Sequence, residues 1–76
     1  MTTKSDTQEV IAANVRRLRG DRSYRDVAAA CSTPDWTCYP ATIQQIESCR
    51  HLPNALIMQR LAVAFGCTVD DLYSEP

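Results

Sequence analysis

Two neighbouring amide side chains, Gln44 and Gln45, lie in the run Ala-Thr-Ile-Gln-Gln-Ile-Glu that spans residues 41–47. The isoleucines of this run, Ile43 and Ile46, are three positions apart, a spacing that places both on one face of a short helix. We expect that face to point into the core. An amide group presents a hydrogen-bond donor and an acceptor together, the arrangement that pairs with N6 and N7 of adenine in the major groove of DNA. The outer face of the helix would carry Ala41, Gln44 and Gln45.

Basic residues are concentrated next to this run, although the formal net charge of the chain is −1. Residues 14–25 contain one acidic residue, Asp21, and five arginines: Arg16, Arg17, Arg19, Arg22 and Arg25. The last seven residues are instead acidic, with Asp70, Asp71 and Glu75. Such an uneven distribution is either an ordinary solvated face or the footprint of a polyanionic partner.

The four cysteines, Cys31, Cys38, Cys49 and Cys67, allow three interpretations. Free cysteine packs as a small hydrophobe, and we expect this role for Cys31 and Cys67. A disulfide between Cys31 and Cys38 would staple the segment that they bracket, although a reducing cytosol opposes it. A zinc site formed by Cys31, Cys38, Cys49 and His51 would have an unfamiliar spacing. We expect no metal and no cofactor.

The composition excludes several classes of protein. With 76 residues, 45% hydrophobic composition and two glycines, the chain suffices for one small all-α domain. It has no apolar run of about 18 residues and no hydrophobic signal region near Met1, so we expect a cytoplasmic protein without a membrane association. No nucleophile with its base, phosphate-binding glycine loop or carboxylate pair is evident, so neither an enzyme nor a small-molecule substrate is expected.

The first half of the chain predicts a disordered tail over residues 1–6, followed by one domain over residues 7–76. A helix should run from Thr7 to Arg19 and end at Gly20, with Ile11, Val15 and Leu18 inward. A capping box of Ser23 and Asp26 should open a second helix over residues 24–31, with Val27, Ala28 and Cys31 inward. Residues 32–39 read as a loop in which Trp36 packs onto the domain.

The second half predicts three more helices. The run that contains Gln44 and Gln45 should form a helix over residues 40–48, with Pro40 in its first turn. A fourth helix should follow the N-cap Asn54 and stop at Gly66, with an inward stripe of Met58, Leu61, Ala62 and Phe65. Leu56 and Val63 lie on its far side, where polar residues are usual. Thr68 and Asp71 should cap a last short helix that returns Leu72 to the core.

The order of these residues resembles the Cro/C1-type helix-turn-helix family of phage and bacterial repressors. The resemblance spans roughly residues 9–73 and rests on these positions: Arg16 to Arg19, Ser23, Val27-Ala28, Thr42-Ile43, Ile46-Glu47, Pro53, Leu61-Ala62, Phe65-Gly66 and Asp71-Leu72. It implies a compact five-helix, lambda-repressor-like DNA-binding domain. The second and third helices would form the helix-turn-helix, and the third would lie in the major groove.

Site residues follow from the resemblance position by position. Base contacts are implied for Ala41, Gln44 and Gln45, with Gln45 our first choice, whereas Pro40 offers no side-chain hydrogen bond. Contacts with the DNA backbone are expected from Arg16, Arg17, Arg22, Tyr24, Arg25, Thr42, Arg50 and His51. The family also pairs an arginine at the end of its first helix with a glutamate of the recognition helix, which implies an ion pair between Arg19 and Glu47.

Three features depart from the family pattern. Residues 32–39 make the connection between the second and third helices about five residues longer than the family's tight turn. The loop between the first two helices is slightly short. Cys49 stands where the family usually has a glycine with positive φ, so the cysteine would either bear backbone strain or force a different turn.

The sequence therefore predicts a regulator of transcription, most simply a repressor, that binds a double-stranded DNA operator without a cofactor. Such a small domain reads few base pairs, so we expect a homodimer at least on DNA. The candidate dimer surfaces are Leu56 with Val63, and Leu72 with Tyr73. The alternative is a protein-interaction module, an antitoxin or antirepressor, that uses the same fold to bind a protein partner.

Overall fold

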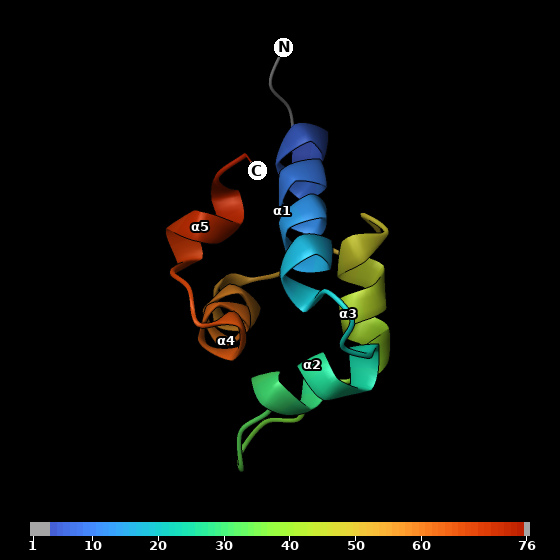
Figure 1. Cartoon of the computed structure of the whole chain (residues 1–76), viewed down its shortest axis with the longest axis vertical. Coiled ribbons are helices and arrows are strands. Elements are labelled where there is room, and N and C mark those ends of the chain that lie inside the picture. The colour runs from blue at the N-terminus through green and yellow to red at the C-terminus, as the bar shows by residue number, and fades with distance from the viewer. Residues whose placement is uncertain (1–3, 76) are drawn as a thin grey trace.

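Residues 4–75, the part of the chain that the computed structural model describes, form five α-helices and no strand (Figure 1). The expected all-α class is confirmed. The one β-type feature among these residues is an isolated bridge between Thr33 and Trp36. The helices are α1 (Lys4–Arg19), α2 (Tyr24–Cys31), α3 (Pro40–Glu47), α4 (Ala55–Phe65) and α5 (Val69–Tyr73).

The helix starts follow the predicted capping residues. Ser23 and Asp26 form a reciprocal capping box on α2: the Asp26 N–H donates to Ser23 Oγ at 3.0 Å, and the Ser23 N–H donates to the Asp26 carboxylate at 3.4 Å. Thr68 and Asp71 form the same box on α5. The Asn54 side chain accepts the Ile57 N–H at 2.9 Å at the start of α4. Each cap satisfies a backbone donor that the helix itself leaves free.

Helix α1 begins earlier than the sequence predicted. The expected start was Thr7, but the helix includes Lys4, so residues 4–6 belong to the helix and the prediction of a disordered tail is wrong for them. Lys4, Ser5 and Asp6 include no proline or glycine, so nothing in their backbone chemistry opposes another helical turn. The remainder of the expected tail, residues 1–3, lies outside the described residues.

The helices surround one hydrophobic core. The predicted inward residues of α2 and α3 are buried, and so is Leu72 of α5. Leu72 is fully buried, so our suggestion that it could form a dimer surface is wrong. Phe65, Leu18 and Trp36 are partly buried against the same core. The fully buried apolar side chains are Ile11, Val15, Val27, Cys31, Ile43, Ile46, Met58, Leu61 and Leu72.

Helix α1 occupies the middle of the arrangement. Figure 1 shows α3 on one side of α1 and α4 with α5 on the other, while α2 crosses below its C-terminal end. Helix α1 packs against α3, α4 and α5, and α2 packs against α3 and α4. Because α3 and α5 lie on opposite sides of α1, the direction in which an α1 side chain points decides which surface it can join.

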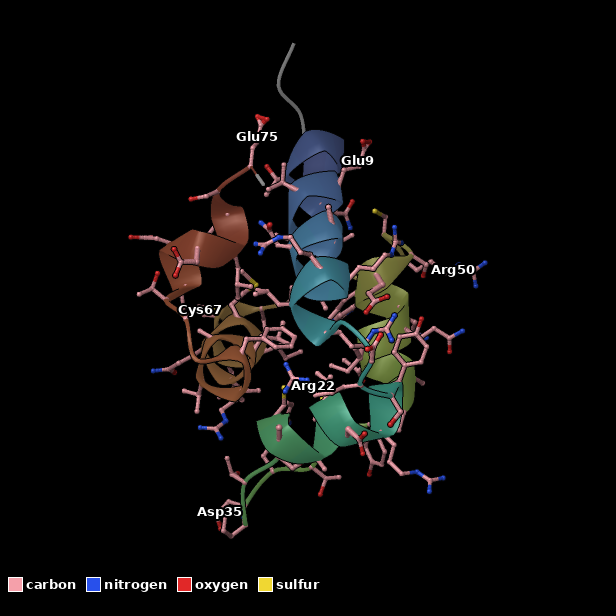
Figure 2. The ribbon with its side chains drawn as sticks, viewed as in Figure 1. Glu9, Arg22, Asp35, Arg50, Cys67 and Glu75 are labelled. Carbon is pink, nitrogen blue, oxygen red and sulfur yellow. The ribbon has the colours of Figure 1, made fainter. Side chains whose placement is uncertain are left out.

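Residues 32–39 form an ordered turn between α2 and α3. The Thr33 N–H donates to the Trp36 carbonyl at 2.7 Å, and the Trp36 N–H donates back to the Thr33 carbonyl at 3.2 Å. Ser32 Oγ accepts the Cys38 N–H at 2.8 Å and donates to the Ala28 carbonyl at 2.9 Å. Trp36 packs against the core as predicted. Figure 2 shows Asp35 at the tip of this turn, at the end of the domain that is farthest from Glu9 and Glu75.

A buried polar residue, Asn14, ties α1 to the end of α5. Its amide nitrogen donates to the Leu72 carbonyl at 2.9 Å and to the Ser74 carbonyl at 2.7 Å, with a longer contact of 3.4 Å to the Asp71 carbonyl. Its side-chain oxygen accepts a hydrogen bond from Arg17 at 3.2 Å. Asn14 is 0% exposed. It therefore supplies, from another helix, the partners that the last carbonyls of α5 need.

None of the helices in residues 4–75 combines the length and apolar character required to cross a membrane.

Replacing Asn14 by alanine should lower the free energy of unfolding by about 2 to 3 kcal/mol, because α5 carbonyls would be left buried without a donor. Urea unfolding followed by circular dichroism measures the change. The control is Gln59→Ala on the exposed side of α4, which should stay within about 0.5 kcal/mol of the parent protein. Equal effects of the two substitutions would contradict the role of Asn14.

Candidate nucleic-acid interface

The outer face of α3 is accessible, as the sequence predicted. Ala41, Gln44 and Gln45 are exposed, whereas Ile43 and Ile46 are 0% and 1% exposed. The α-helical spacing thus separates the apolar and amide side chains onto opposite faces. The two amides are free to approach another molecule.

A shallow hollow joins these side chains to a basic residue. It is lined by Ala41, Gln44, Gln45, Ser48 and Arg50. Arg50 is exposed, and Figure 2 shows it extending away from the domain beside the C-terminal end of α3. The hollow therefore combines amide groups, which can pair with base edges, with a guanidinium group, which can bind phosphate.

The backbone at the end of α3 fixes the position of Arg50. The Cys49 N–H donates to the Ile46 carbonyl at 3.2 Å, and the Arg50 N–H donates to the Gln45 carbonyl at 2.9 Å. These two bonds form a Schellman motif, which needs a left-handed residue at the position that Cys49 occupies. Cys49 has φ of 61°, the single positive φ of a non-glycine residue in the described chain. Of the two outcomes foreseen for Cys49, the structure has the strained one.

The predicted ion pair between Arg19 and Glu47 is present, and it joins the ends of α1 and α3. Arg19 Nε donates to Glu47 Oε2 at 2.6 Å, and Arg19 Nη2 donates to Oε1 at 3.0 Å. The Glu47 side chain is 4% exposed and that of Arg19 is 20% exposed. The Glu47 carboxylate raises the pKa of Arg19, chiefly through their hydrogen bond. This bidentate geometry is the strongest that a guanidinium and a carboxylate can form.

Tyr24 completes this cluster from the first position of α2. The Arg19 guanidinium lies over the Tyr24 ring, 4.4 Å from its centre, a cation–π contact. The Tyr24 hydroxyl donates to Glu47 Oε1 at the long distance of 3.5 Å. Tyr24 was expected to contact the DNA backbone; its partly buried ring instead packs within the domain, and its hydroxyl has an internal acceptor.

Two further arginines lie near the ends of α3. Arg16 Nη2 donates to the Glu47 carbonyl at 3.0 Å, and its side chain remains 64% exposed beside the C-terminal end of α3. At the other end, exposed Arg25 lines a second hollow together with Ser23, Tyr24, Asp26 and Pro40. Arg16 and Arg50 therefore lie at one end of α3, and Arg25 lies at the other.

The structure does not bring Arg17 and Arg22 to the same surface. Arg17 donates a hydrogen bond to Asn14, and its positive charge favours the ionised forms of Cys67 and Asp71. These neighbours place Arg17 on the α5 side of α1. Arg22 Nη2 donates to the Leu18 carbonyl at 3.0 Å, and its guanidinium lies 5.4 Å from the centre of the Phe65 ring. Figure 2 shows Arg22 between α1, α2 and α4. The expectation that both would contact DNA beside α3 therefore has no geometric support.

Thr42 and His51, the other expected backbone contacts, are both partly buried. The Thr42 N–H donates to the Tyr39 carbonyl at 2.9 Å at the start of α3. His51 follows Arg50 in the connection to α4. Thr42 lies in the first turn of α3, and His51 lies four residues after the last residue of that helix.

The cysteines are free thiols. Cys31 is fully buried and Cys67 partly buried against the core, as expected, and Cys38 is buried as well. Burial raises the pKa of Cys31 to about 11, with the neighbouring Cys38 contributing. Within residues 4–75, no three metal-binding side chains come together, so the arrangement considered for zinc is not formed.

An apolar surface remains on α4. Leu56 and Val63 are 47% and 59% exposed, as predicted, and Tyr73 of α5 is 50% exposed. Arg60, which lies between Leu56 and Val63 in the sequence, donates from Nε to the Cys31 carbonyl at 3.0 Å and so binds the C-terminal end of α2.

Comparison with known proteins gives no match: no protein-family model, curated protein or solved structure is significantly similar to the chain.

Arg19→Ala should destabilise the domain by about 3 to 5 kcal/mol, because it leaves the Glu47 carboxylate buried without its cation. Urea unfolding measures the loss. Arg16→Ala is the matched control, because it removes the same charge. Arg16 is mostly exposed, and its guanidinium is as far as 3.8 Å from the Glu47 carboxylate. The cost of this substitution should therefore stay below about 1 kcal/mol. An Arg19→Ala protein that melts at the parent temperature would refute the importance of the pair.

Cys49→Gly should stabilise the domain by about 1 kcal/mol, because glycine adopts the required positive φ without the steric cost that a side chain has there. Thermal unfolding measures the gain. The control is Ser48→Gly at the preceding residue, whose φ is −95°; this change should lower stability. If Cys49→Gly lowers it too, the left-handed backbone at residue 49 is not strained.

Proposed function

We propose that the chain is a sequence-specific DNA-binding regulator of transcription, a repressor of the Cro/C1 type, and that α3 is its recognition helix. The observation that carries the proposal is the hollow shared by Ala41, Gln44, Gln45 and Arg50. It puts groups suited to base edges beside a group suited to phosphate, the two kinds of contact that DNA recognition combines.

The charge distribution around α3 supports the proposal. Arg16 and Arg50 at one end and Arg25 at the other leave the amide face between cationic groups. A helix in the major groove has a phosphate backbone on either side, so this distribution suits it. The contact surface that we propose excludes Arg17 and Arg22, and it assigns Arg19 to holding α3 rather than to binding DNA.

The arrangement of the helices is compatible with a lambda-repressor-like domain. Helices α2 and α3 pack against each other, the Arg19–Glu47 pair joins α1 to α3, and the turn of residues 32–39 lies at the C-terminal end of α2. Figure 2 shows Asp35, at the tip of that turn, well away from Arg50, so the longer connection does not obstruct the amide face. This is the specific fold that we propose for the five helices.

Dimerisation on a two-fold operator follows from the small size of the site. One short helix reads few base pairs, so useful specificity requires two copies. The exposed pair Leu56 and Val63 on α4 is the surface that we propose for this contact. Leu72, being buried, takes no part.

The same exposed apolar pair favours the alternative, a protein-interaction module of the antitoxin or antirepressor kind. A near-neutral net charge of −1 is also compatible with a protein partner. The two functions differ in their response to salt. Phosphate contacts release counterions, so DNA binding must weaken steeply as salt concentration rises, whereas an apolar contact has no such requirement.

The decisive experiment measures affinity for a duplex selected from a random pool, over a range of salt concentrations. Log affinity should fall linearly with log salt, and Arg50→Ala should reduce the slope by about 0.9 for each bound copy, the value for one phosphate contact. Gln45→Ala should leave the slope unchanged but lose about 1 to 3 kcal/mol of discrimination against the wrong base.

Arg17→Ala is the control for the arginine substitution, since it removes the same charge from the α5 side of the domain. It should leave the slope nearly unchanged. A slope near zero for the parent protein, with no duplex preferred in the selection, would refute the proposal in favour of a protein partner.

A further inference from the structure

Tyr39, the residue that precedes α3, is unusually exposed. Its exposed fraction is 63%, the largest among the exposed large hydrophobic residues of the described chain. Two other members of this group, Leu56 and Val63, already have a role in the proposed function. Tyr39 has no assigned role, although it directly adjoins the recognition segment.

The side chain of Tyr39 does nothing for the helix that it starts. Tyr39 is the N-cap residue of α3, and it makes no side-chain capping hydrogen bond. Serine, threonine, asparagine or aspartate at this position would stabilise the helix by accepting a free backbone N–H. Helices α2, α4 and α5 all have such caps: Ser23, Asn54 and Thr68. Only α3 of these four has a large aromatic residue in their place, and most of that residue faces solvent.

The backbone nevertheless holds Tyr39 firmly. Its carbonyl accepts the Thr42 N–H at 2.9 Å. The preceding residue, Cys38, is 5% exposed, and its N–H is bound to Ser32 Oγ at 2.8 Å. The following residue is Pro40, whose ring fixes its own φ and restricts the backbone of Tyr39. Because the backbone is already fixed, binding a partner through Tyr39 restricts only the two χ angles of its side chain.

Tyr39 also adjoins the part of α3 that lacks polar side chains. Pro40 and Ala41 are exposed but offer no side-chain hydrogen bond. Pro40 lines the hollow that contains Arg25, between the starts of α2 and α3. A tyrosine hydroxyl can donate where neither of these residues can, and its ring can lie against the apolar part of a sugar.

We propose that Tyr39 is a DNA-backbone contact whose hydroxyl donates to a phosphate oxygen next to the N-terminal end of α3. This inference rests on the proposed function, because it needs α3 to lie in the major groove. It assigns to the turn of residues 32–39 a role in binding as well as in connecting the helices. Tyrosine hydroxyls are among the side-chain groups that commonly bind phosphate in protein–DNA complexes.

The test compares Tyr39→Phe with Tyr73→Phe, a control that removes the same hydroxyl from an exposed tyrosine on α5. The probe is a mixed-sequence DNA duplex titrated at several salt concentrations. Tyr39→Phe should bind about tenfold more weakly, the loss expected for one hydrogen bond to a charged group. Its salt dependence should equal that of the parent protein, since a neutral hydroxyl releases no counterion. Tyr73→Phe should bind as the parent protein does.

A second variant separates a role in binding from a role in folding. Tyr39→Ser supplies the missing N-cap, so it should raise the midpoint of urea unfolding while weakening binding to the same duplex by tenfold or more. A structural tyrosine would instead give lower stability and weaker binding together, which would overturn the inference.

The possible failures are distinguishable. If the parent protein binds the duplex and Tyr39→Phe binds equally well, the assignment of Tyr39 is wrong while the proposed function stands. If the parent protein does not bind duplex DNA at low salt, both are overturned, and the exposed tyrosine belongs to a surface for another kind of partner.

Discussion

The ion pair between Arg19 and Glu47 is the interaction on which the geometry of the proposed site depends. Glu47 is the last residue of α3, and its buried carboxylate accepts hydrogen bonds of 2.6 and 3.0 Å from Arg19. A buried charge is tolerable only when it is paired, so α1 and α3 must meet at this point. Tyr24 adds the start of α2 to the same cluster. One carboxylate thereby links three helices. Together with the buried Ile43 and Ile46, it orients α3 so that Gln44 and Gln45 face outward.

The same constraint divides the arginines by function. Arg19 is committed to Glu47, Arg22 binds the C-terminal carbonyls of α1, and Arg17 points toward α5. Arginines that are close together in the sequence therefore lie in different places on the domain. Only Arg16 and Arg25 of these arginines lie beside α3, one at each end, and Arg50 joins Arg16 at the C-terminal end. The basic surface is consequently smaller than the arginine content suggests.

Local chemistry explains which features the sequence could predict. Caps, glycine stops and apolar spacing are short-range signals, so the starts of α2, α3, α4 and α5 and the outward face of α3 followed from them. The Arg19–Glu47 pair came from the family resemblance. The directions of Arg17 and Arg22 were missed because they depend on α5 and α4, which lie far along the chain and leave no local signal near these arginines. Asn14 had a usable signal: it lies three residues after Ile11 on an apolar stripe, and a polar residue there needs a buried partner.

The most direct test of α3 as the DNA-binding helix is a nuclear magnetic resonance titration with the selected duplex, in which the side-chain amides of Gln44 and Gln45 and the Arg50 guanidinium are observed. We expect these resonances to shift together, with no comparable change at Leu56 or Val63 when one domain binds one half-site. Shifts confined to the α4 surface, or amide resonances that remain unchanged at saturation, would contradict the assignment of α3 as the DNA-binding helix.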